Sequence, residues 1–123
     1  MNKKKRKNGP PQNGSCPSKY RTVWLFALFD LPTDTREDKR WYRRFRKALL
    51  TQGFTMLQYS VYARFFASME RAETFHKNLK IELPPDGQVR FLPVTDVQFG
   101  KMEVYEGKKR IETEKPPDQL LLL

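Results

Sequence analysis

One short segment restricts the fold of this chain more than any other. Val23–Phe29 is an unbroken run of apolar residues, three of them aromatic, and it ends at Asp30-Leu31-Pro32. The run is too short for a typical helix, and a strand without apolar and polar alternation is one that is covered on both faces. The sequence therefore predicts a central β-strand here.

Three further elements follow in quick succession. Thr33-Asp34-Thr35 offers side-chain oxygens that can cap a helix, and this helix is expected to run to about Gln52, before Gly53. Two β-prone runs, Phe54–Gln58 and Val61–Phe66, are separated by hardly any residues, which indicates a hairpin.

The second half of the chain repeats the pattern. Ser68 is expected to cap a second helix, which should continue until Pro84. Val89–Thr95 reads as a strand, and Pro93 within it favours an edge position or a bulge. A further short strand is expected within Phe99–Tyr105.

The resulting order, β-α-β-β-α-β plus an extra strand, predicts an α+β fold of the ferredoxin-like type, with an antiparallel sheet and both helices on one face. We assign residues 21–107 to this domain. Residues 1–20 are expected to form a disordered basic tail, and residues 108–123 a C-terminal tail that is a candidate for docking on a partner.

The open face of such a sheet needs a cover, because the first strand is apolar on both sides. Homodimerisation through the sheet face is the simplest solution, and a late strand at Val104-Tyr105 could pair with the edge of the second copy. The alternative is that the chain's own tails fold back over the face.

Composition excludes several classes of site. Cys16 is the only cysteine and His76 the only histidine, so neither an intrachain disulfide nor a Cys/His zinc site can form within one chain. The sequence contains no P-loop or dinucleotide-binding glycine motif. It has no apolar run of membrane-spanning length and no signal-peptide pattern, which favours a cytoplasmic protein without a membrane partner.

The net charge of +10 points to a polyanionic partner, but its location matters. The chain has 24 Lys/Arg and 14 Asp/Glu residues, and residues 1–21 carry seven of the Lys/Arg and no acid. The rest of the chain therefore has 17 basic and 14 acidic residues, a net charge of +3. The tail is either a nucleic-acid arm or a solvated extension.

The first helix carries the most informative charge pattern. At about 100° per residue, Trp41, Phe45 and Leu49 fall on one face, and the opposite face is cationic. The candidate nucleic-acid-binding residues are Arg36, Lys39, Arg40, Arg43, Arg44 and Lys47, with Arg46 beside them. The phosphates of a duplex would neutralise this stripe, and such backbone contacts do not depend on base sequence. The alternative is a basic face that is merely solvated.

Asp30 is the candidate metal-binding and catalytic residue. A carboxylate that ends an apolar strand, just before a helix, can hold a hard cation such as Mg²⁺ or cap the helix, and the residue types leave both roles open. Two copies of Asp30 across a dimer axis could share one ion and activate water for phosphodiester cleavage. Asp96 is not expected to help, because its strand runs antiparallel to the first one.

Three segments together carry a family resemblance. They are Trp24–Pro32 (WLFALFDLP), Tyr42–Lys47 (YRRFRK) and Gly53–Tyr62 (GFTMLQYSVY). From about Val23 to Gly107 the chain resembles the Cas2 family of small CRISPR adaptation proteins, in particular the form found in systems with a single large effector nuclease.

The resemblance implies a ferredoxin-like homodimer that bridges dimers of the CRISPR integrase and supports the DNA to be inserted as a new spacer. It also implies a metal-dependent endonuclease activity on RNA or double-stranded DNA, with Asp30 matching the family's metal-binding aspartate. The preceding residue, often Tyr in the family, is Phe29 here, and the basic tail is a departure from the family. A stand-alone, toxin-like ribonuclease of the same fold is the alternative function.

Overall fold

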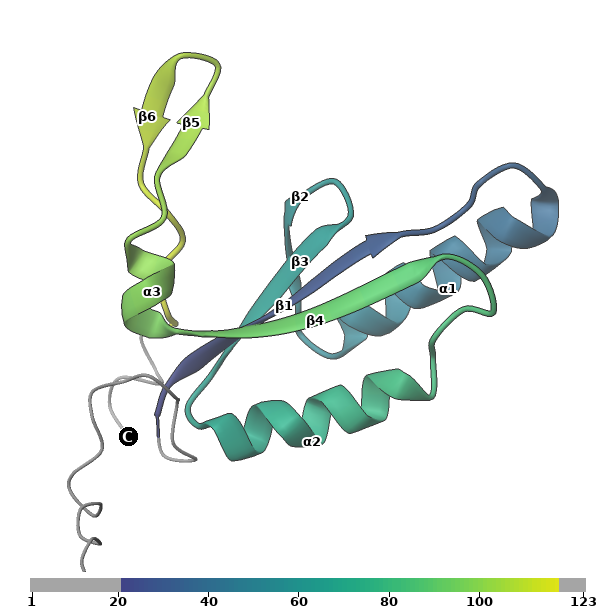
Figure 1. Ribbon diagram of the computed structural model, residues 1–123, viewed down its shortest axis with the longest axis horizontal. Helices are drawn as coiled ribbons and strands as arrows, with labels where there is room; N and C mark the ends of the chain where they lie inside the picture. Colours follow the sequence, from purple (N-terminus) through teal and green to yellow (C-terminus); the bar gives the residue numbers. More distant parts are fainter. Residues whose placement is uncertain (1–20, 118–123) are drawn as a thin grey trace, which may run out of the picture.

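Strand β1 (Val23–Asp30) lies in the middle of a four-stranded antiparallel sheet with the order β2-β3-β1-β4 (Figure 1). The computed structural model describes residues 21–117, so the predictions for the basic N-terminal tail and for the C-terminal leucines lie outside the described residues. The remaining elements are α1 (Arg36–Thr51), β2 (Thr55–Gln58), β3 (Val61–Phe66), α2 (Met69–Lys80), β4 (Gln88–Thr95), α3 (Asp96–Gly100), β5 (Val104–Glu106) and β6 (Lys109–Ile111). The predicted ferredoxin-like α+β fold is confirmed.

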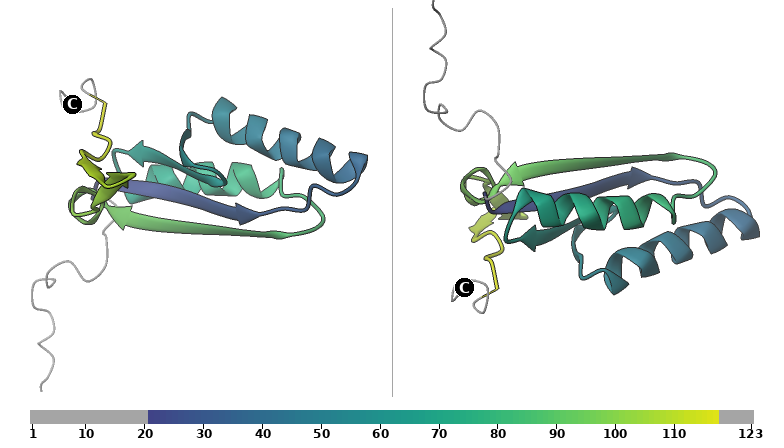
Figure 2. Two further views of the ribbon diagram at one scale, coloured as in Figure 1. Left: turned by 90° about the horizontal axis from the view of Figure 1, so that it is seen from above. Right: turned by 90° about the horizontal axis from the view of Figure 1, so that it is seen from below.

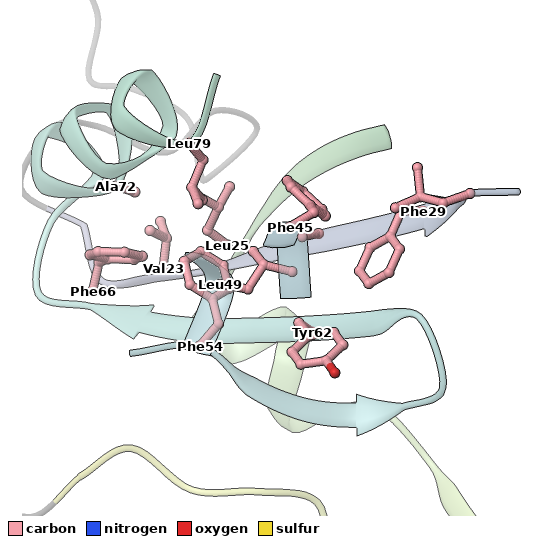
Figure 3. Close-up of a cluster of buried hydrophobic side chains, with 12 residues drawn as sticks. Val23, Leu25, Phe29, Phe45, Leu49, Phe54, Tyr62, Phe66, Ala72 and Leu79 are labelled. Atoms are coloured by element: carbon pink, nitrogen blue, oxygen red, sulfur yellow. The ribbon is translucent and has the colours of Figure 1, made fainter. Parts of the chain in front are cut away.

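The pleat of β1 divides its side chains between two apolar layers. Val23, Leu25, Ala27 and Phe29 point to the face that carries both helices, where they meet buried side chains of α1 and α2 (Figure 3). Trp24 belongs to a second cluster on the opposite face, with Phe26 packed against it. The expectation of a central strand covered on both faces is therefore correct.

Helix α1 is fixed at both ends by side chains. Thr35 and Asp38 form a reciprocal capping box, with hydrogen bonds of 3.0 and 3.2 Å. At the other end, Arg64 donates to the Gln52 carbonyl at 2.9 Å, and its guanidinium lies over the ring of Phe75 at 4.3 Å. The rotation of α1 about its axis is thus set by the core and by its caps.

The edge position predicted for the proline-containing strand is also confirmed. Pro93 lies in β4, which pairs with β1 on one side and ends the sheet on the other. The second helix begins at the predicted cap, Ser68, but it ends at Lys80 and not next to Pro84. The segment after it is a turn, so the predicted helix was three residues too long.

The strand predicted within Phe99–Tyr105 is partly wrong. Phe99 belongs to α3, a short helix with its own capping box between Thr95 and Gln98. Phe99 stacks on Trp24 with ring centroids 3.9 Å apart, and the Trp24 indole donates to the Asp96 carboxylate at 2.9 Å. These tertiary contacts hold a helix that local sequence pattern does not predict.

Residues 104–106 do form a strand, β5, which pairs with β6 in a separate two-stranded hairpin. This hairpin extends beyond residue 107, where the sequence predicted the end of the domain. Figure 1 and both views of Figure 2 place α3 and this hairpin at the end of the sheet opposite to the start of α1. Within residues 21–117, no helix has the length and apolarity needed to cross a membrane.

The turn before β4 requires glycine. Gly87 has a φ of +89°, and a Cβ atom at this position would lie 2.6 Å from the Asp30 carbonyl oxygen and 2.9 Å from Leu31. We expect Gly87→Ala to lower the free energy of unfolding by roughly 2–5 kcal/mol, as the sum of left-handed strain and overpacking. Urea denaturation followed by circular dichroism measures this.

Gly107 is the matched control, because its φ is +66° but a Cβ atom there would meet nothing within 4 Å. Gly107→Ala should cost no more than about 1–2 kcal/mol. Equal losses for the two variants would show that the close approach to Asp30 is not what requires Gly87.

Candidate nucleic-acid interface and metal site

The cations of α1 lie on its outer surface, as predicted. The side of α1 turned to the core buries Phe45 and Leu49, and the six candidate residues Arg36, Lys39, Arg40, Arg43, Arg44 and Lys47 are all exposed. Like charges three and four residues apart repel each other, so this surface attracts a polyanion more strongly than a mixed surface would.

The structure separates Arg44 from the rest of this group. Its Nε donates to Glu82 at 3.1 Å, and its guanidinium lies 5.2 Å from the centre of the Trp41 ring. Arg44 therefore faces the α2 side of the helix and already has a counter-charge. Arg40 has only a long contact of 4.0 Å with Glu37, and among the described residues no ion pair involves Lys39, Arg43 or Lys47.

The other side of α1 carries a feature that sequence reasoning missed. Arg46 donates to the hydroxyl of Tyr62 at 2.7 Å, and Tyr42 stacks on Tyr59 with centroids 6.2 Å apart and planes 22° from parallel. Tyr59 lies in the β2–β3 turn and is 76% exposed. Nothing in the linear pattern pairs residue 42 with residue 59, because packing of α1 against the sheet creates this contact.

Asp30 is exposed at the last position of β1, opposite Gln88 of β4. Because side chains alternate along a strand, Asp30 shares the open face of the sheet with Trp24 and Phe26, whereas Phe29 points into the helix-side core. The capping alternative for Asp30 is wrong, since Thr35 caps α1. The metal-binding role remains a prediction.

The two other titratable residues considered from sequence have structural surroundings. Asp96 lies at the opposite end of the sheet from Asp30 and accepts the hydrogen bond from Trp24, which agrees with its exclusion from the site. His76 packs against Phe91, with ring centroids 4.6 Å apart. Burial, and secondarily the charge of Lys80, lowers the pKa of His76, so this histidine is a packed neutral side chain at neutral pH.

A single copy of the chain offers few ligands for a metal ion. Among residues 21–117 there is no cluster of three or more potential ligands of the His, Cys, Asp or Glu type. Mg²⁺ is commonly bound through only one or two carboxylates while it keeps several waters. One Asp30 is the smallest donor set that this ion accepts, and a pair of Asp30 carboxylates from two copies would match the larger one.

Comparison with known proteins decides the family. The profile described as "CRISPR associated protein Cas2" matches residues 23–102, which include the whole sheet and both long helices. The chain belongs to the Cas2 family.

Individual Cas2 proteins agree with this assignment. A "CRISPR-associated endoribonuclease Cas2" of Parvibaculum lavamentivorans is 54% identical over 100 residues, which cover 81% of this chain and 99% of that protein. A protein of the same description from Flavobacterium psychrophilum is 47% identical over 105 residues, covering 85% and 91% of the two chains. A solved structure described as "Crystal structure of cas2" superimposes with a TM-score of 0.51 at 18% identity, covering 76% of this chain and 99% of that one, and so supports the fold.

The exposed carboxylate of Asp30 should contribute little to the stability of the fold. Its side chain is exposed, and among the described residues it takes part in no ion pair or side-chain hydrogen bond. We expect Asp30→Asn to change the free energy of unfolding by less than about 0.5 kcal/mol. A loss of more than about 1 kcal/mol in urea denaturation would mean that this carboxylate has a structural role after all.

Proposed function

We propose that two copies of this Cas2-family chain form a dimer that holds duplex DNA by its backbone and joins CRISPR integrase subunits during spacer acquisition. The observation that carries this proposal is the exposed cationic surface of α1. Lys39, Arg40, Arg43 and Lys47 stand there with almost no acidic partner, whereas Arg44 on the flank is neutralised by Glu82.

Duplex DNA supplies the counter-charge that this surface lacks. Each phosphate that a Lys or Arg neutralises releases condensed counterions, and Arg can grip a phosphate with two parallel hydrogen bonds. The side chains lie along the outside of a helix and reach a backbone without entering a groove. We therefore propose binding that depends strongly on salt and weakly on base sequence.

The open face of the sheet supports the dimer. Phe26, Val94 and Met102 are only partly buried there, and Leu92 is 50% exposed. Part of the cover comes from the chain itself, because Phe99 of α3 packs on Trp24, and residues 114–117 line a groove of about 330 Å³ together with Trp24 and Phe65. The surface around Leu92 and the outer edge of β4 stay uncovered, so a second copy could pack there. The small β5–β6 hairpin has only marginal stability on its own, so it too would gain from contact with a second copy.

A metal-dependent endonuclease activity is the second part of the proposal. It rests on the exposed position of Asp30 on the open face and on the description of the curated relatives as endoribonucleases. In the dimer, two Asp30 carboxylates would hold one divalent ion, Mg²⁺ by preference, which supplies a more acidic bound water as nucleophile. RNA and double-stranded DNA are both substrates of the right chemistry.

The double variant Arg40→Ala/Arg43→Ala tests the DNA-binding surface. We expect the slope of log affinity against log salt for a duplex to fall by about 2 per protomer, and affinity to fall most at low salt, because two phosphate contacts are lost. Fluorescence anisotropy with a labelled duplex, without and with the cognate integrase, measures both quantities.

Arg71→Ala/Lys101→Ala is the charge-matched control. Both residues are exposed and lie at the end of the molecule that carries the start of α2 and α3 (Figure 1). If both double variants change the slope equally, only net charge matters. If neither changes it, α1 is a solvated basic surface, and a stand-alone ribonuclease that needs no integrase becomes the better account.

Asp30→Ala tests the nuclease. We expect Mg²⁺-dependent cleavage of RNA or duplex substrates to fall to background while duplex binding keeps the wild-type affinity and salt slope, because Asp30 lies outside the basic surface. Gel-based cleavage assays with and without chelator, alongside anisotropy, measure the two functions. Undiminished cleavage in the variant would remove Asp30 from the active site.

A further inference from the structure

Two arginines on opposite flanks of α1 are held through the same atom, but their partners differ in charge. Arg44 donates its Nε to the Glu82 carboxylate at 3.1 Å. Arg46 donates its Nε to the Tyr62 hydroxyl, which carries no charge, at 2.7 Å. We propose that Arg46 is a phosphate-binding residue and that Tyr62 fixes its position in the absence of nucleic acid. This inference rests on the proposed DNA-binding function and deepens it, because it names one contact of the α1 surface and the residue that positions it.

The guanidinium of Arg46 keeps its full charge and most of its donors. A carboxylate partner cancels most of the attraction that an arginine exerts on an anion, whereas a hydroxyl does not. Among the described residues, no ion pair involves Arg46, and its side chain is exposed. A guanidinium has five N–H donors, and only the one on Nε is used here. The terminal nitrogens therefore remain for a second, anionic partner.

Tyr62 is a rigid support for this side chain. It lies on β3, is only 1% exposed, and its ring stacks on Phe29 with centroids 5.6 Å apart. Figure 3 shows its hydroxyl pointing away from the other labelled side chains of the core. Because the ring cannot turn without disturbing the core, the hydroxyl is a fixed point to which the Arg46 side chain is attached.

A side chain that is already held binds an anion more tightly than a free one. A long arginine side chain samples many rotamers, and binding normally removes this freedom at a cost in affinity. In Arg46 the bond to Tyr62 has removed part of that freedom during folding. The simpler alternative is that the bond only satisfies a buried tyrosine hydroxyl, and this alternative predicts no effect of the hydroxyl on nucleic-acid binding.

The neighbours of Arg46 favour a polyanion over a single acidic side chain. By the helical rotation of about 100° per residue, Lys39, Arg43 and Arg46 fall on one side of α1, and they span about 10 Å at 1.5 Å per residue. All three are exposed, and among residues 21–117 none of them belongs to an ion pair. A row of phosphates supplies several negative charges at once, as this group of cations requires.

The salt dependence of duplex binding tests the contact. We expect Arg46→Ala to lower the slope of log affinity against log salt by about 1 per protomer, because one phosphate contact is lost. Arg44→Ala is the matched control. It removes the same charge from the other flank and should leave the slope nearly unchanged, since Glu82 already neutralises that side chain. Fluorescence anisotropy with a labelled blunt duplex over a salt series measures both variants.

Tyr62→Phe separates position from charge. It keeps the buried ring and the charge of Arg46, so the slope should stay at the wild-type value. Affinity at low salt should fall about 3- to 10-fold for each Arg46 contact, because the freed side chain has to be ordered on binding. Arg46→Lys should also keep the slope and lose affinity, since an ammonium has no fork that can hold one phosphate with two parallel bonds.

A double-variant cycle shows whether Tyr62 acts through Arg46. We expect Tyr62→Phe to weaken binding of the wild-type protein and to have no further effect when Arg46→Ala is already present. A role of the hydroxyl in folding alone would change affinity equally in both backgrounds, or in neither. Both variants should fold, because Arg46 is exposed and phenylalanine keeps the buried ring, and urea denaturation checks this.

The outcomes separate this inference from the proposed function. An unchanged slope in Arg46→Ala overturns the inference, and so does an equal effect of Tyr62→Phe in both backgrounds. Loss of integrase assembly with a normal slope in Arg46→Ala also overturns it, and makes this side chain a protein contact. Failure of the proposed function is a different result, namely an unchanged slope in Arg40→Ala/Arg43→Ala, which leaves Arg46 and Tyr62 in place.

Discussion

The two-sided pairing of β1 is the constraint on which the rest of the structure depends. With β3 on one side and β4 on the other, its alternate residues enter two separate apolar layers. One layer receives α1 and α2, and the other receives α3. The same pleat sends Asp30 to the open face, and the Phe29 amide anchors the turn that carries Tyr59. The place of Asp30 and the anchoring of the β2–β3 turn therefore both depend on one strand.

Helix α1 converts this core into a functional surface. Full burial of Phe45 and Leu49 is worth about 1.5–3 kcal/mol for each side chain, whereas a like-charge pair at helical spacing costs only about 0.2–0.5 kcal/mol. Core packing therefore sets the rotation of the helix and tolerates the repulsion among its cations. The energy of that repulsion is recovered when a polyanion binds, which is why a basic surface of this kind is suited to a nucleic-acid backbone.

Most of the sheet and both long helices could be predicted, because apolar periodicity, capping residues and breakers are local signals. The prediction was least accurate after β4. Helix α3 is only five residues long, and it depends on stacking of Phe99 on Trp24, far away in the chain. Strand β6 reads Lys-Arg-Ile and is exposed throughout, so it has no apolar pattern that would reveal a strand.

The sequence by itself determined the order of the elements, the cationic stripe of α1 and the candidacy of Asp30, because each follows from residue type and spacing along one element. The tertiary structure alone decided how these residues combine. It neutralised Arg44 with Glu82, joined Arg46 to Tyr62 by a hydrogen bond, and stacked Tyr59 on Tyr42. Such contacts join side chains from different elements, and only the packing of helices against the sheet brings those elements together.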